Sequence, residues 1–276
     1  MTLRDRYVDL LFSTLTRSAF LDEEVHDVRL DQWEGLAALA TDAETLKQVL
    51  RQTGTRLTHK GGDASLRQVG HDWPPTAETM VGVDRLNDVR RCVAQVLDDG
   101  IPGDFIETGV WRGGVTILMR GMLEAWGDPD RCVWVADSFE GLPPPDTDNY
   151  PADAGMDWST VTPLKVSADE VRANFERYGL LDDRVKFLEG WFSDTLATAP
   201  IDQLAILRLD GDLYESTMDA LTALEPKVAD GGYVLVDDYG GWEACRKAVD
   251  GYRGQHGITS PIEEVDWTGV HWRVER

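Results

Sequence analysis

Residues 204–213 read LAILRLDGDL, and this stretch decides the fold. An almost continuous apolar run ends at two acids, Asp210 and Asp212. A second apolar run, GGYVLV at 231–236, ends in the same way at Asp237 and Asp238. Nearly continuous apolar runs are typical of parallel strands buried on both faces. The sequence therefore predicts two buried strands that each deliver two carboxylates to the same edge of a sheet.

The sequence around these two runs has the alternating pattern of an α/β protein. Amphipathic helices are predicted at 85–99, 113–126, 166–180, 215–228 and 242–255. Short apolar strands are predicted between them at 104–110, 131–139 and 185–192. Strands that alternate with helices indicate a mostly parallel sheet covered on both faces. The tail, PIEEVDWTGVHWRVER at 261–276, instead reads as an antiparallel hairpin with its turn near Thr268–Gly269.

The N-terminal part of the chain has a different pattern. Apolar positions at helical spacing predict a helix over 4–18, and a second helix is expected over 33–52. The stretch THKGGDAS at 58–65 is rich in glycine and polar residues and predicts a loop. We therefore expect a helical N-terminal region over 1–83 and one globular unit over 84–276.

Composition excludes several classes of function. The net charge is −23 and no cluster of lysine or arginine occurs, which argues against nucleic acid as a partner. No window approaches the ~20 apolar residues that a membrane helix requires, and the first residues lack a signal-peptide pattern. The three cysteines, Cys92, Cys132 and Cys245, form no CxxC pair and are expected to be buried, inert thiols in a reducing cytoplasm.

The residues that follow the first three strands suggest a ligand site. In open α/β sheets, ligands bind outside the carboxyl ends of the strands. The first strand ends in ETGVWRGG at 107–114, whose glycines allow a backbone to approach a ligand. It lacks the GxGxxG spacing of dinucleotide sites, and Glu107 suits a positively charged ligand. The alternative is a tight turn with a capping acid.

The next two strand ends are compatible with an adenosine group. Asp137 follows the second strand, where an acid commonly accepts hydrogen bonds from ribose hydroxyls. Trp191 and Phe192 follow the third and suit packing against a purine, although an ordinary core role is the alternative.

The four aspartates suggest a metal. Carboxylates buried together raise one another's pKa, and a hard divalent cation such as Mg²⁺ offsets their charge. Asp210, Asp237 and Asp238 are the expected ligands. Asp212 would lie beside them, where it can take a proton from a hydroxyl group. Helix capping or solvated loop acids remain the alternative.

Several stretches together closely resemble the macrocin O-methyltransferase family. They are DFIETGVWRGG, VWVADSFEGLP, EGWFSDTL, LAILRLDGDLYEST and GGYVLVDDYG, with HDWPPTAETMVG, DRLNDVRRCV, DWTGVHWR and RYVDLLFSTLT outside them. Members are metal- and S-adenosylmethionine-dependent enzymes that methylate sugar hydroxyls of macrolides and aminocoumarins. Residues 27–66 carry no family motif, which leaves the acceptor open.

The resemblance implies a class I methyltransferase fold, with a seven-stranded, mostly parallel sheet and an antiparallel C-terminal hairpin. It implies S-adenosylmethionine, Mg²⁺ on Asp210, Asp237 and Asp238, and Asp212 as general base. The residues expected at the cofactor are Thr79, Met80, Val81, Glu107, Thr108, Gly109, Val110, Trp111, Arg112, Gly113, Asp137, Ser138, Gly190, Trp191, Phe192 and Asp210.

The acceptor is expected to be a glycosylated small molecule. The loop over 142–164 and the N-terminal region would close over it, with Tyr150, Trp158 and Tyr214 as candidate sugar-stacking residues. The alternatives are a catechol-type O-methyltransferase, an NAD-dependent oxidoreductase and a non-catalytic scaffold. The family also suggests a homo-oligomer.

Overall fold

A seven-stranded sheet forms the centre of the molecule. The computed structural model describes residues 1–21, 23, 25–27, 42–53 and 58–276. The strands are β3 (Asp104–Thr108), β4 (Val133–Asp137), β5 (Val185–Glu189), β6 (Leu204–Leu209), β7 (Val228–Val236), β8 (Glu263–Glu264) and β9 (Val270–Arg273). Their order is β5-β4-β3-β6-β7-β9-β8, and only β9 pairs antiparallel with its neighbours. The predicted parallel sheet and antiparallel C-terminal hairpin are confirmed.

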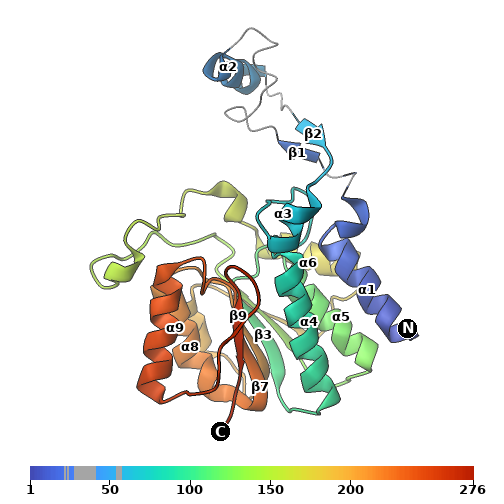
Figure 1. The fold of residues 1–276 in the computed structure, drawn as a ribbon, viewed down its shortest axis with the longest axis vertical. Coiled ribbons are helices and arrows are strands. Elements are labelled where there is room, and N and C mark those ends of the chain that lie inside the picture. Colours follow the sequence, from blue (N-terminus) through green and yellow to red (C-terminus); the bar gives the residue numbers. More distant parts are fainter. Residues whose placement is uncertain (22, 24, 28–41, 54–57) are drawn as a thin grey trace.

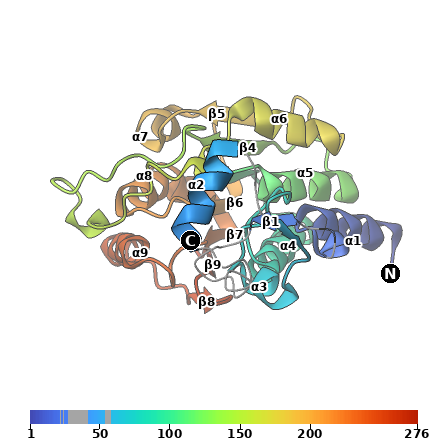
Figure 2. The ribbon, with the colours of Figure 1, turned by 90° about the horizontal axis from the view of Figure 1, so that it is seen from above.

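Helices cover both faces of the sheet (Figure 2). One layer contains α4 (Val83–Asp98), α5 (Gly114–Trp126) and α6 (Ala168–Arg177), and the other contains α8 (Tyr214–Leu224) and α9 (Glu243–His256). The helix α1 (Leu3–Leu15) packs on α5 and adds four apolar side chains to the first core layer. The N-terminal helix therefore shares the core of the rest of the chain. Shorter helical turns are α7 (Phe192–Thr195) and the 3₁₀ turns Ser18–Phe20, Pro151–Asp153, Thr162–Leu164, Leu196–Thr198 and Glu225–Lys227.

Local sequence explains where several helices begin. Thr2 and Asp5 form a reciprocal capping box at the start of α1. Ser167 caps α6, because its hydroxyl accepts a hydrogen bond from the Glu170 N–H over 3.2 Å. The strand predicted over 185–192 is shorter than expected. It ends at Glu189, since Gly190 has a φ of 140° and α7 begins at Phe192.

Three short elements between α1 and α4 lie outside the main body (Figure 1). Strands β1 (Val25–Asp27) and β2 (Thr58–Lys60) form an antiparallel pair, and α2 (Ala43–Thr53) lies beyond them. The loop predicted over 58–65 is therefore wrong in part: it contains β2 and the start of α3 (Ala64–Val69), which the Asp63 carboxylate caps. Of the helix predicted over 33–52, residues 33–41 lie outside the described residues.

A buried polar cluster joins α4 to the last strand. The Asp88 carboxylate lies 2.6 Å from Arg91 and 3.0 Å from the His271 ring on β9. Of the cysteines, Cys92 and Cys245 are buried as predicted, whereas Cys132 is only half-buried. Burial raises the pKa of all three thiols, which keeps them neutral. None of the helices that the structure describes is long and apolar enough to cross a membrane.

Candidate active site

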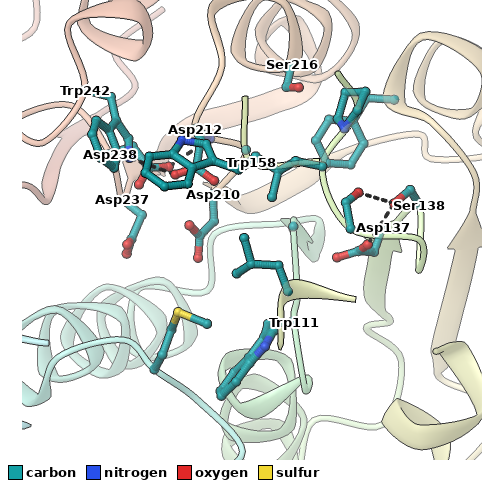
Figure 3. A pocket seen from close by; sticks show the side chains of 18 of the residues that line it. Trp111, Asp137, Ser138, Trp158, Asp210, Asp212, Ser216, Asp237, Asp238 and Trp242 are labelled. Carbon is teal, nitrogen blue, oxygen red and sulfur yellow. Dashed lines mark hydrogen bonds between the residues drawn. The ribbon is translucent and has the colours of Figure 1, made fainter. Parts of the chain in front are cut away.

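A cavity of about 450 Å³ opens at the carboxyl ends of β3, β4, β6 and β7. It lies where the strand order reverses between β3 and β6, the usual ligand position in such sheets. Its volume is in the range of small-molecule sites. Of the predicted site residues, it is lined by Met80, Val81, Gly109, Trp111, Asp137, Ser138, Trp158, Trp191, Phe192, Asp210, Asp212, Asp237 and Asp238. Figure 3 shows the four clustered aspartates at one end and Asp137 with Ser138 at the other.

The glycine turn after β3 brings the two central strand ends together. Gly109 has a φ of 87°, and a Cβ atom placed on it would lie 1.8 Å from the backbone oxygen of Asp210. No other residue fits there without moving the turn that carries Asp210. The sequence reading of this glycine as a point of close backbone approach is thus correct, although the partner is backbone of the same chain.

Seven residues predicted at the cofactor do not line the cavity: Thr79, Glu107, Thr108, Val110, Arg112, Gly113 and Gly190. The Glu107 side chain is 1 % exposed, and its carboxylate binds Arg208 over 2.5 Å behind the cavity wall. The Arg112 guanidinium donates hydrogen bonds to the backbone oxygens of Pro74, Pro75 and Ala77, so it supports the segment before Met80. A direct role of these seven residues in cofactor binding stays a prediction.

Asp137 lies at the end of β4 with its carboxylate fixed by backbone. Its Oδ2 accepts a hydrogen bond from the Val110 N–H over 2.8 Å, and its Oδ1 accepts one from the Phe139 N–H over 2.7 Å. Burial raises its pKa, and these hydrogen bonds oppose the rise. A carboxylate has about four acceptor positions, so further donors can bind. Trp191 is 37 % exposed, which excludes the ordinary core role.

Three aspartates lie close enough together to bind one metal ion. Asp210, Asp237 and Asp238 each offer a carboxylate oxygen, and these oxygens lie within 4.8 Å of one another. Oxygen ligands in a compact group suit Mg²⁺, so the donor set fits this ion. Asp212 follows Asp210 in the left-handed region, with a φ of 58°, which aspartate tolerates better than most residues. Its N–H donates to Asp238 Oδ2 over 3.1 Å.

Two buried arginines also compensate these acids, and the sequence interpretation missed both. Arg208 on β6 lies 2.7 Å from Asp210 and also pairs with Asp237. Arg85 on α4 pairs with Asp237 and, over 2.9 Å, with Asp266. These arginines supply part of the compensation that the sequence interpretation assigned to a divalent cation. The signal for Arg208 was present, because it is the one charged residue within the apolar run LAILRL.

The arginines leave part of the negative charge uncompensated. Burial and the charge of Asp210 together raise the pKa of Asp212 to about 7, although the hydrogen bond from Trp242 opposes the rise. Burial and Asp237 likewise raise the pKa of Asp210 to about 6 despite Arg208. Burial and Asp212 raise the pKa of Asp238. Carboxylates that are hard to ionise beside one another favour a bound cation.

Aromatic side chains surround the aspartate end. The ring centroids of Trp158 and Trp242 are 5.7 Å apart, and the Trp242 Nε1–H donates to Asp212 Oδ1 over 2.8 Å. The ring centroids of Tyr150 and Tyr214 are 6.2 Å apart, and neither residue lines the cavity. Of the three candidate sugar-stacking residues only Trp158 lines it, and its stacking role stays a prediction. Lining residues that were not predicted include Trp73, Arg85, Glu215, Ser216, Asp219, Trp242 and Trp267.

The sheet order and the position of the cavity define a class I, S-adenosylmethionine-dependent methyltransferase. The sequence profile of the family described as macrocin-O-methyltransferase (TylF) matches residues 4–274. The chain belongs to this family and is an O-methyltransferase. It is thus neither an oxidoreductase nor a non-catalytic scaffold.

Individual proteins support this assignment. The chain is 57 % identical, over 214 residues, to an 8-demethyl-8-(2,3-dimethoxy-α-L-rhamnosyl)-tetracenomycin-C 4′-O-methyltransferase of Streptomyces olivaceus, covering 76 % of this chain and 81 % of the relative. It is 53 % identical, over 212 residues, to a demethyldecarbamoylnovobiocin O-methyltransferase of Streptomyces niveus, with the same coverage. The solved structure of the O-methyltransferase NovP matches with a TM-score of 0.83 and 43 % identity, covering 99 % of this chain and 100 % of NovP.

Proposed function

We propose that this chain transfers the methyl group of S-adenosylmethionine to a sugar hydroxyl of a glycosylated small molecule of the antibiotic type, with Mg²⁺ and with Asp212 as general base. The observation that carries the proposal is the single cavity that joins the Asp137 end to the four clustered aspartates. The names of the two bacterial relatives, which act on a tetracenomycin glycoside and on a novobiocin precursor, support the acceptor class.

The cofactor would lie along the cavity from β5 to β3. Asp137 and Ser138 are placed to accept hydrogen bonds from the ribose, and Trp191 with Phe192 borders the adenine. Met80, Val81 and Trp111 would surround the methionine part. Trp111 is held in position because its Nε1–H donates to the Pro163 oxygen over 2.9 Å. The same hydrogen bond links the loop over 142–164 to the side of the cavity that we assign to the cofactor.

Asp210, Asp237 and Asp238 would hold Mg²⁺, while Arg208 and Arg85 fix Asp210 and Asp237 from behind. When bound, the ion lowers the pKa of an acceptor hydroxyl and the sulfonium cofactor supplies the methyl group. Asp212 Oδ1 already accepts a hydrogen bond from Trp242, so Oδ2 is the oxygen that would take the proton. Base catalysis of this kind contributes about 10²–10⁴-fold.

The division of the chain also stays a proposal. Residues 1–83 would act as a cover, since Met80 and Val81 line the cavity from this part, and residues 84–276 would form the catalytic unit. A homo-oligomer and a cytoplasmic location stay predictions.

The test measures cofactor, metal and acceptor separately. Calorimetry should show binding of S-adenosylhomocysteine, and Mg²⁺ should bind to protein stripped with EDTA. Methyl transfer is then followed with the two acceptors named for the relatives and with catechol, to which a sugar enzyme should transfer no methyl group. Methylation of catechol alone would favour the catechol-type alternative.

Asp212→Asn tests the base. It should lower turnover by about 10²-fold or more and leave binding of S-adenosylhomocysteine intact. Asp219→Asn, another acid of the cavity wall, is the control. Unchanged turnover in Asp212→Asn would remove Asp212 from the mechanism.

A further inference from the structure

Two tryptophans at the cavity remain unusually exposed. Trp73 is 47 % exposed and Trp267 is 49 % exposed, although both line the cavity. Large apolar surface that stays in contact with water beside a binding cavity is typical of an interaction site. Tryptophan is also among the residues that contribute most to binding energy. The roles assigned above to the cofactor and metal residues use neither ring.

Trp267 is fixed before any ligand binds. Its Nε1–H donates to the Val69 oxygen over 2.8 Å, and its ring centroid lies 4.6 Å from that of His71. On another side it packs on Gly241, where an added Cβ would lie 3.2 Å from Trp267 Cζ3. An exposed ring held on several sides loses little conformational entropy on binding, so it is preorganised for a partner.

The segment that carries Trp73 is also anchored. Asp72 pairs with the buried Arg67 over 3.3 Å, and the Pro74 oxygen accepts a hydrogen bond from Arg112 over 3.2 Å. Trp73 therefore extends from a backbone that is held on both sides.

Trp267 lies close to the aspartate end. The Arg85 guanidinium is 5.9 Å from the centre of the Trp267 ring and donates to Asp237. The hydroxyl of the neighbouring Thr268 donates a hydrogen bond to the backbone oxygen of Asp237 over 2.8 Å. The Arg85 side chain therefore lies between the Trp267 ring and Asp237, a predicted metal ligand. A sugar hydroxyl at the aspartates would direct the group attached to that sugar toward the rings.

The charge of the cavity restricts what that group can be. The lining carboxylates are Asp137, Asp210, Asp212, Glu215, Asp219, Asp237 and Asp238. Among the described lining residues the single cationic side chain is Arg85, which already pairs with Asp237 and Asp266. Outside the predicted metal ligands and base, the cavity wall would still present a nucleoside diphosphate with the carboxylates of Glu215 and Asp219 and with no unpaired arginine or lysine among the described lining residues. An uncharged apolar group would meet two tryptophan rings.

We propose that Trp73 and Trp267 bind the aglycone of the acceptor. This inference rests on the proposed function and adds a subsite to it. The subsite would take an uncharged, apolar aglycone, so a glycosyl transfer to that aglycone must precede methylation.

The test compares three forms of one sugar. The first is whichever of the two relatives' glycosides the wild-type protein methylates better, the second is the methyl glycoside of the same sugar, and the third is its nucleoside-diphosphate form. Trp73→Ala and Trp267→Ala should each raise KM for the complete glycoside about 3- to 10-fold, with kcat much less affected. The advantage in kcat/KM of the complete glycoside over the methyl glycoside should shrink in the same variants. Leu10→Ala, an exposed apolar residue on α1, is the matched control.

Binding of S-adenosylhomocysteine verifies that each variant is folded. The aglycone subsite is wrong if the complete glycoside has no advantage over the methyl glycoside in wild-type protein, if neither variant raises KM, or if the nucleoside-diphosphate sugar is the better substrate. Loss of the proposed function looks different, because wild-type protein would then bind S-adenosylhomocysteine and methylate none of the glycosides. That outcome would overturn both proposals.

Discussion

The Trp242 Nε1–H donates a hydrogen bond to Asp212 Oδ1 over 2.8 Å, from the residue before α9 to the turn after β6. This hydrogen bond fixes the rotation of the Asp212 carboxylate. The left-handed backbone conformation of Asp212 fixes the direction in which its side chain leaves the chain. One oxygen is thereby oriented toward the cavity. A small misplacement of a reacting group costs rate without affecting ligand binding, because alignment is lost.

Trp242→Phe should therefore lower kcat about 10-fold while the affinity for S-adenosylhomocysteine stays the same. The phenyl ring keeps most of the packing against Trp158 but donates no hydrogen bond. Trp126→Phe is the matched control, since it also loses an indole hydrogen bond, to Asp98 over 2.7 Å, but does not line the cavity. Steady-state kinetics checks this, and equal kcat values for the two variants would show that the hydrogen bond does not orient the base.

Arg208 should be essential for folding as well as for the site. Its guanidinium lies among Glu107, Asp210 and Asp237, and it is almost fully buried. Arg208→Met would leave buried carboxylates unpaired, which costs about 3–5 kcal/mol of unfolding free energy. Urea unfolding in EDTA measures this. Arg246→Met, at an exposed arginine on α9, should change the free energy by less than about 0.5 kcal/mol. A similar small loss in Arg208→Met would mean that the carboxylates are protonated in the folded protein.

The sequence predicted the sheet well because buried strands carry a local signal. The runs LAILRL and GGYVLV are apolar over most of their length, and the acids after them mark the strand ends. That local pattern was enough to bring Asp210 and Asp212 together with Asp237 and Asp238. It also predicted the change to an antiparallel hairpin, because the tail alternates and contains a turn.

The sequence could not predict contacts between distant segments. Arg85 pairs with Asp237 across 152 positions, and Trp267 donates to the Val69 oxygen across 198. Such pairs depend on how α4 and the β8–β9 connection pack, which no local pattern encodes. The pairing of Glu107 with Arg208 was missed for the same reason, since Arg208 comes from the neighbouring strand.

Asp153 should connect the loop over the cavity to α8. It is fully buried, and its carboxylate accepts hydrogen bonds from the N–H groups of Tyr214 over 2.6 Å and Glu215 over 3.2 Å. These are the first residues of α8, whose own N-cap Leu213 has no side chain able to accept a hydrogen bond. Asp153 therefore caps the helix from another segment, where a carboxylate also interacts well with the helix dipole.

Asp153→Ala should lower the unfolding free energy by about 1–2 kcal/mol and increase amide hydrogen exchange at the start of α8. Asp157→Ala, in an exposed turn of the same loop, is the control. If the exchange rates of Tyr214 and Glu215 do not change, the loop does not stabilise this helix end.

Asp88 should make stability depend on pH in the acid range. Burial by itself raises the pKa of Asp88, but the hydrogen bonds and charges of His271 and Arg91 outweigh it, and the net pKa lies below its ordinary value. A carboxyl group with a lowered pKa in the folded state stabilises the protein when ionised. That contribution is complete above the unfolded-state pKa of about 4 and disappears as the pH falls through the folded-state value.

Asp88→Asn should thus cost about 1.5–3 kcal/mol at pH 7, the usual worth of hydrogen bonds to a charged group. The cost should be constant from pH 7 to about 5 and should shrink below about pH 4, where wild-type Asp88 also takes up a proton. Asp84→Asn, on the same helix but half-exposed, should cost little at any pH. Urea unfolding at several pH values checks this. A difference between wild type and Asp88→Asn that grows as the pH falls from 7 toward 4 would show that burial, and not the His271–Arg91 pair, controls Asp88, because only a pKa raised above the unfolded-state value gives that sign in that range.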